Sequence, residues 1–165
     1  MRFAIIKQGG LCAGGIEKYL QQISKMLIDA GHSVTYFYTD AVPCGQNNWM
    51  HPGTDPVRED YMRSIGAKLV EVKCAHIKAL ERGGEWLDTD FWELFDENDF
   101  DAVIGGHKGE PNWPFSKMKD VPIIETVHGT AFTSGVSKYA TAYILISEIQ
   151  KQKWFELGGL KDKTY

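Results

Sequence analysis

The stretch FAIIKQGGLCAGGIEKYLQQISKMLIDAGHSVTYFY, residues 3–38 of a chain of 165, decides the fold. It opens with a short apolar run at residues 3–7, which is typical of a buried strand. A glycine-rich segment follows, and apolar residues then recur at helical spacing as far as Leu27. Gly31 is well placed to end this helix, and residues 33–38, rich in β-branched and aromatic side chains, predict a second strand.

The rest of the chain continues this alternation of strands and helices. Further strands are predicted at residues 67–72, 101–105, 121–127 and 142–146. One helix is predicted at residues 57–64. A last one begins at the N-cap Ser147, with Gln150 at the capping-box position. Strands that alternate with helices pair in parallel through right-handed crossovers. The sequence therefore predicts an α/β fold, a Rossmann-like open parallel sheet with helices on both faces.

Two segments do not fit the simple alternation. Residues 39–56 hold three prolines and predict a long loop. Residues 75–97 fit two helical pieces, at 75–82 and 90–95, split by two adjacent glycines at 83 and 84.

Composition excludes several classes of protein. The net charge of −4 argues against a nucleic-acid-binding protein that relies mainly on contacts to the phosphate backbone. Three cysteines without a close pair indicate neither a disulfide framework nor a zinc site. No apolar stretch is long enough to cross a bilayer, and no signal peptide opens the chain. We expect a cytoplasmic protein, with peripheral contact to a membrane left open.

Open α/β sheets bind ligands beyond the carboxyl ends of their strands. This rule selects the loops at residues 8–15, 39–56, 106–114 and 128–135. In the first loop, Gly14 and Gly15 precede a helix whose N-terminus favours an anion such as a diphosphate. Neither the dinucleotide fingerprint nor the phosphate loop ending in Gly-Lys-Ser/Thr is present, so a plain turn into the helix is the alternative.

Two histidines occupy equivalent positions at the predicted edge. His128 follows the strand at 121–127, where an imidazole could donate to a sugar hydroxyl or transfer a proton. A histidine bonded to nearby backbone is the alternative. His107, with Lys108, follows the strand at 101–105 and could bind an anionic or hydroxylated group. The alternative there is a solvated polar loop.

Two Asp-x-Asp pairs could hold a divalent metal ion against a diphosphate, but both have a structural interpretation. Asp88 or Thr89 fits an N-cap before the helical piece at 90–95. Asp99 and Asp101 precede a strand, at the end of the sheet opposite to the ligand edge. We therefore expect no metal site.

Four segments, taken together, resemble the N-terminal half of a family 4 glycosyltransferase of the GT-B fold. These are Gly-Gly-Ile-Glu at 14–17 leading to Gly-His-Ser-Val at 31–34, Asp-Ala-Val-Ile at 101–104 with His107, the strand ending in His-Gly at 122–129, and the strand ending in Ser147. They occur in the family's order and span nearly the whole chain.

The resemblance implies transfer of a sugar from a nucleotide-sugar to an acceptor, without a metal ion or other cofactor and with retention. It implies a catalytic-site role for His128, which would contact the donor sugar. The donor-binding residues would be Gly14, Gly15, Gly129 and Thr130. His107 and Lys108 would face a sugar or lipid-linked acceptor, and Glu17 matches the motif with helix capping as one role.

The resemblance also implies a missing partner. In this family a second, C-terminal domain with a Glu-x7-Glu signature holds most of the nucleotide, and this sequence has no such acidic pair in context. We therefore expect residues 1–165 to be one N-terminal, acceptor-side domain. It would form one wall of a cleft completed by a further domain or subunit.

Two other functions stay open. The chain could be a non-catalytic α/β binding or regulatory module that kept the fold. It could also be a dinucleotide-binding oxidoreductase domain, since Asp40 lies where a ribose-binding acid would sit, although the glycine spacing argues against this.

Overall fold

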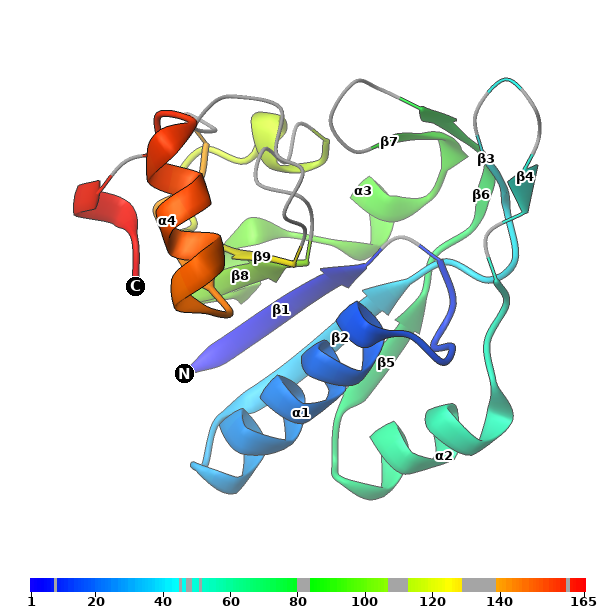
Figure 1. The fold of residues 1–165 in the computed structure, drawn as a ribbon. Helices are drawn as coiled ribbons and strands as arrows, with labels where there is room; N and C mark the ends of the chain where they lie inside the picture. Colours follow the sequence, from blue (N-terminus) through cyan, green and yellow to red (C-terminus); the bar gives the residue numbers. More distant parts are fainter. Residues whose placement is uncertain are drawn as a thin grey trace.

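The computed structural model describes residues 1–7, 9–44, 46, 49–50, 52–79, 84–106, 113–128, 139–159 and 161–165. Its main element is a six-stranded sheet in the order β10-β9-β8-β1-β2-β5, in which every pairing is parallel. Its strands are β1 (Arg2–Lys7), β2 (Ser33–Tyr38), β5 (Lys68–Glu71), β8 (Ala102–Gly105), β9 (Ile123–Val127) and β10 (Ala142–Leu145). Figure 1 shows β1 near the centre of the molecule.

Helices cover both faces of this sheet, as predicted. The helices are α1 (Gly15–Asp29), α2 (Pro56–Ser64), α3 (Phe91–Leu94) and α4 (Glu148–Glu156), and 3-10 turns occupy Glu97–Asp99, Phe115–Lys117 and Lys161–Lys163. Helices α1 and α2 pack on the face that carries Phe3 and Ile5. The opposite face carries Ala4 and Ile6 and is covered by α3, while Trp154 of α4 packs on Tyr143.

Each long helix begins and ends where its sequence signals lie. Asp55 caps α2 by accepting a bond from the N–H of Val57 at 3.0 Å. Gly31, with φ of 82°, ends the turn after α1, because glycine adopts this conformation without steric cost. In α1 the apolar face packs on the sheet and Leu20 is completely buried, so tertiary packing adds to the local signals.

The predicted cap of α4 is confirmed. The Ser147 hydroxyl accepts a bond from the N–H of Gln150 at 3.2 Å. The side-chain Oε1 of Gln150 in turn accepts a bond from the N–H of Ile146 at 2.7 Å, one residue before the cap. Two backbone donors at the start of the helix are thereby satisfied by a reciprocal pair, in the manner of a capping box.

A second, four-stranded sheet, which was not predicted, lies in the segments expected to be a loop and a helix. Its order is β4-β3-β6-β7, with β3 (Pro43–Cys44), β4 (Trp49–Met50), β6 (Cys74–Ala79) and β7 (Gly84–Thr89). The two short strands lie within the predicted loop at 39–56. The predicted helix at 75–82 is wrong, since residues 74–79 form β6.

The reason for this difference lies in the period of burial along β6. Ile77 is completely buried while its neighbours His76 and Lys78 are more exposed, which is the two-residue period of a strand. Across the antiparallel pairing with β7, Ile77 faces Trp86, which is also buried. This cross-strand pair of large side chains gives the hairpin an apolar face to bury.

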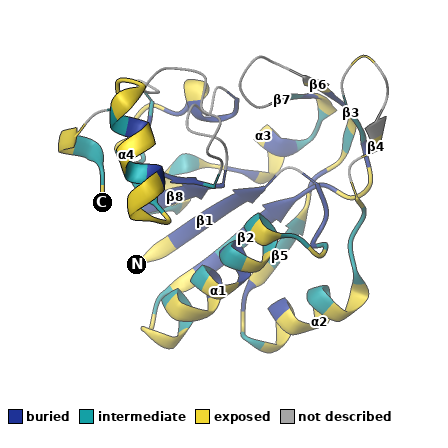
Figure 2. Cartoon of the chain, in the orientation of Figure 1, coloured by how far each residue is buried: buried dark blue, intermediate teal, exposed yellow. Residues whose placement is uncertain are grey.

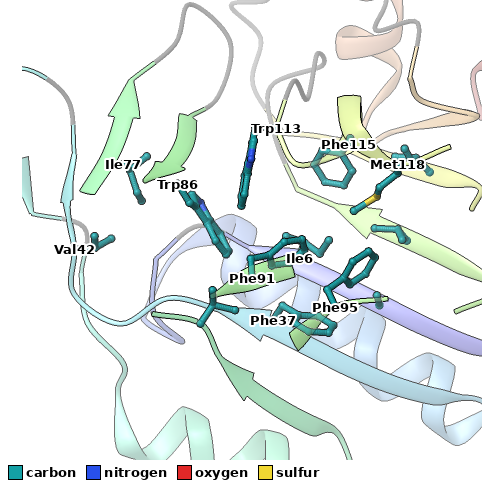
Figure 3. Close-up of a cluster of buried hydrophobic side chains, with 14 residues drawn as sticks. Ile6, Phe37, Val42, Ile77, Trp86, Phe91, Phe95, Trp113, Phe115 and Met118 are labelled. Atoms are coloured by element: carbon teal, nitrogen blue, oxygen red, sulfur yellow. The ribbon is translucent and has the colours of Figure 1, made fainter. Parts of the chain in front are cut away.

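An aromatic cluster joins the second sheet to the first. Figure 3 shows Trp86 of β7 and Trp113 between the hairpin and Phe91 of α3, with Phe37 of β2 beneath. The ring centroids of Trp86 and Trp113 are 4.9 Å apart, and those of Phe37 and Phe91 are 5.8 Å apart. The helical piece predicted at 90–95 is confirmed in part, because α3 starts there and buries Phe91.

Figure 2 shows that the exposed residues of α1 and α2 lie along their outer faces, whereas β1 and β8 are buried along nearly their whole length. Within the described part of the chain, no helix has the length and apolar character needed to span a membrane. All three cysteines, Cys12, Cys44 and Cys74, are free thiols.

Candidate functional site

The carboxyl edge of the parallel sheet carries the start of α1. Gly14 is the N-cap residue, with extended backbone (φ −172°), and no side chain caps the helix there. A Cβ on Gly15 would meet no atom within 4 Å, so this residue faces open space. A Cβ on Gly14, in contrast, would collide with the carboxylate of Glu17. The two glycines therefore differ: Gly15 leaves the helix start accessible, and Gly14 makes room for Glu17.

Glu17 pairs with the last residue of β1. Its Oε1 lies 3.1 Å from Lys7 Nζ, and the two side chains are only 15% and 10% exposed. A carboxylate in the first turn of a helix interacts favourably with the helix dipole. Lys7 offsets the charge of Glu17, so the pair brings no net charge to the helix start.

His128 lies immediately after β9, on the same edge. Its Nε2 is 3.2 Å from the Thr126 hydroxyl oxygen, and that hydroxyl is 2.8 Å from the carbonyl oxygen of Gly105. A hydroxyl has a single hydrogen, and a carbonyl can only accept, so Thr126 donates to Gly105 and accepts from His128. This assigns the proton of the neutral imidazole to Nε2 and leaves Nδ1 as an acceptor.

The surroundings of His128 favour its neutral form. The imidazole is half-buried, and burial lowers its pKa, although the nearby carboxylates of Glu125 and Glu17 act in the opposite direction. The ring packs edge-on against Tyr19 of α1, with centroids 4.7 Å apart. His128 is thus held between its own strand and the helix, in an orientation fixed from both sides.

An open groove of about 950 Å³ joins these parts, and its volume falls within the range of small-molecule sites. Helix α1 forms one wall through Gly15, Glu17 and Tyr19, with His128 and the end of β10 opposite. Gly106, just after β8, contributes indirectly: a Cβ there would lie 2.9 Å from Ile16 Cγ2, so glycine lets α1 pack close to the sheet.

The glycine-rich segment also contacts the predicted loop at 39–56. The N–H of Gly10 donates to the carbonyl of Pro52 at 3.0 Å, and the N–H of Asp55 donates to the carbonyl of Leu11 at 3.0 Å. Asp40, the candidate ribose-binding acid, accepts a bond from the N–H of Thr54 at 2.9 Å. Its carboxylate therefore serves to hold this loop.

The predicted residues are brought together in part. Gly15 and His128 line the same groove, and Gly14 stands at its helix start. The other candidates, His107, Lys108, Gly129 and Thr130, lie outside the described residues.

Sequence reasoning missed residues that line the groove and residues that hold its lining side chains in place. Thr126 lies two positions before His128, so the alternation of a strand could have placed both on one face. Lys7 ends the apolar run of a buried strand at the ligand edge, and a charged side chain that is buried there requires a partner. Ile144 of β10 and Ile146, just after the strand, gave no signal, because apolar strand residues look alike whether they face a core or a groove.

One aspartate of each Asp-x-Asp pair has a structural contact: Asp101 with Arg2, and Asp90 with the N–H of Lys73. Asp101 is paired with Arg2 at 3.1 Å, at the edge of the sheet opposite to the groove. The Thr89 hydroxyl accepts from the N–H of Phe91, as a cap would, although the N-cap residue of α3 is Asp90. Across the described ranges, no group of three potential metal ligands comes together.

Comparisons with known proteins show the fold. HepE (Alr3699) of Anabaena, solved in complex with UDP-glucose, superposes with a TM-score of 0.57 at 12% sequence identity, covering 100% of this chain. A second structure of HepE, in complex with UDP and glucose, gives a TM-score of 0.56 at 13% identity. This chain spans 43% of the length of the HepE chain. Neither a protein-family model nor a curated protein sequence matches the chain.

Proposed function

We propose that this chain is the N-terminal, acceptor-side domain of a glycosyltransferase, and that the groove beside α1 receives a nucleotide-sugar. One observation carries the proposal: the uncapped start of α1 and the oriented imidazole of His128 face one groove at the ligand edge of the sheet. The fold shared with HepE, which binds UDP-glucose, gives the ligand class.

The diphosphate of the donor lies at the start of α1. Gly15 allows phosphate oxygens to approach the backbone N–H groups, which carry the positive end of the helix dipole. Lys18, on the same groove wall, adds a positive charge. Because Lys7 neutralises Glu17, the acid already at the helix start does not repel the ligand. In this proposal these groups carry the charge of the diphosphate without a metal ion.

His128 contacts the donor sugar through Nδ1. Its Nε2–H is committed to Thr126, so the neutral ring accepts a hydrogen bond from a sugar hydroxyl. Transfer occurs with retention, to a sugar or lipid-linked acceptor that approaches from the carboxyl end of β8. A second domain or subunit supplies the opposite wall of the cleft and most of the contacts to the nucleotide.

Titration of the chain with UDP-glucose, followed by calorimetry or NMR, tests the proposal. We expect weak binding, and a loss of about tenfold in affinity, or ~1.4 kcal/mol, in both Gly15→Val and His128→Ala. In Gly15→Val the added methyl groups block the approach to the helix start. In His128→Ala a hydrogen bond to the sugar is lost.

His76→Ala is the matched control, since this half-buried histidine of β6 belongs to the second sheet. It should bind UDP-glucose like the parent chain. If UDP-glucose binds equally to all three variants, the donor site is not this groove and the proposal is wrong.

A further inference from the structure

A second hollow lies between α1 and α2, separate from the groove. It has a volume of about 360 Å³, at the small end of the range for ligand sites. Lys18 and Gln22 of α1 line both hollows, so a single ridge of the helix separates them. The second hollow is also lined by Gln21, by Arg58 of α2 and by its N-cap Asp55.

The side chain at the buried end of this pocket has an unused donor. Gln21 is only 3% exposed, and its Oε1 accepts a bond from Arg58 Nη1 at 3.0 Å. A guanidinium only donates, so this bond fixes which end of the amide faces Arg58. The Nε2 of Gln21 is therefore directed elsewhere, and it has no acceptor among the described residues. A buried donor without an acceptor is costly to the folded state.

Arg58 has an unused donor as well. Its Nε is buried and makes no hydrogen bond within the described part of the chain. Asp55 is the nearby acid, but its Oδ2 is 3.9 Å from this nitrogen, beyond hydrogen-bond distance. The other carboxylate oxygen of Asp55 already accepts the N–H of Val57.

The charge of the pocket favours an anion. Lys18 is exposed and pairs with no acid in the described ranges, so Lys18 and Arg58 together outweigh the single carboxylate of Asp55. This is a locally positive site on a chain whose net charge is −4. Charged donors bind phosphate and carboxylate oxygens more strongly than neutral donors do.

We propose that this pocket binds a small molecule through an oxyanion group, a phosphate or a carboxylate. An anion oxygen supplies the acceptor that Gln21 Nε2 and Arg58 Nε lack, and Lys18 closes over it from the ridge. The volume suits a ligand of the size of a sugar phosphate or a hydroxy acid and is too small for a nucleotide-sugar. The site uses neither Gly15 nor His128, and it shares the ridge residue Lys18 with the donor groove.

NMR titration of the ¹⁵N-labelled chain with inorganic phosphate, and separately with acetate, tests this proposal, with sodium chloride at matched ionic strength as the reference. The side-chain resonances of Gln21 and Arg58 should shift saturably at millimolar concentration with at least one anion. The better anion then identifies the ligand group. If neither anion produces a saturable shift of these resonances, the proposal is overturned.

Three variants make the test specific. Arg58→Gln and Lys18→Gln should each weaken binding by about tenfold, and Lys18 is exposed, so its replacement leaves folding intact. Arg63→Gln on the same helix, which removes an equal charge from an exposed ion pair with Glu59, should leave the affinity unchanged. Equal weakening by Arg63→Gln would show general charge attraction only. Binding lost in Gly15→Val and retained in Arg58→Gln would place the anion in the groove instead.

Discussion

The two sheets of this molecule are built in different ways. The parallel sheet joins segments far apart in the sequence, and its central strand β1 is buried on both faces. The second sheet rests mainly on the local β6–β7 hairpin and is buried on the side of Ile77 and Trp86. The described residues that line the groove and the α1–α2 pocket all belong to the first sheet and its helices and loops.

From this difference we expect stability and binding to be separable. The second sheet covers one face of the core through an aromatic cluster and stands apart from both candidate sites. The carboxyl edge of the first sheet carries the groove, where hydrogen bonds and charges orient a few side chains. Changes in the second sheet should therefore alter stability alone, and changes at the edge should alter binding as well.

The largest effect should come from detaching the second sheet. Trp86→Ala should lower the free energy of unfolding by about 3–5 kcal/mol, because it leaves a cavity beside Trp113 and Phe91. Urea unfolding measures this. Trp92→Ala is the control, since Trp92 is 40% exposed and should cost much less. The comparison of the two sheets fails if the folded fraction of Trp86→Ala binds UDP-glucose more weakly than the parent.

A smaller effect on stability, but one that reaches the site, should follow from Thr126→Val. The buried hydroxyl is lost, so Gly105 loses a donor and His128 an acceptor, at a cost of about 1–3 kcal/mol. The ¹⁵N shifts of the His128 ring should then show a mixture of both tautomers. Thr35→Val, at a half-buried strand position, is the control and should leave these shifts unchanged. Unchanged ring shifts in Thr126→Val would contradict the assignment of the proton to Nε2.

The smallest effect should be a dependence of stability on pH. Burial lowers the pKa of folded His128 below its ordinary value of 6.5, so the unfolded chain binds a proton more readily. As the pH falls from 6.5 through the folded pKa, the free energy of unfolding should fall and then level off with respect to this group. Unfolding of the parent and of His128→Gln, compared between pH 5 and 7.5, isolates the effect. If the free energy of unfolding of the parent rises relative to that of His128→Gln as the pH is lowered, the prediction is wrong.

The first sheet could be predicted from the sequence because its signals are local and consistent. The strand at Ser33–Tyr38 has the predicted bounds and the cap at Ser147 is the predicted one, while α2 starts at Pro56, one residue before the predicted helix at 57–64. In this sheet the apolar runs, the helical periodicity and the turn residues each predict the element that the fold contains. Such consistency between local signals and the overall fold is typical of a well-specified structure.

The second sheet and most of the groove could not be predicted in the same way. The segment Ala75–Ala79 is short enough to fit either period, and only the partner Trp86 across the hairpin decides for the strand. At the groove, the pairing of Lys7 with Glu17 and the packing of Tyr19 on His128 join residues that come together only when the sheet and α1 have assembled. The sequence indicates the edge and the residue types, whereas tertiary packing determines which of them meet.

The central position of β1 has a consequence for how the chain is made. Phe3 comes before both of its pairing partners in the sequence, Val34 of β2 and Ala102 of β8. The pairing of β1 with β2 can form once β2 has been synthesised, but the pairing with β8 has to wait for β8. Contacts between segments distant in the sequence also form slowly. Within this sheet, β1 is translated before its neighbours and completed late. Until then one edge of β1 is open to pairing with another chain.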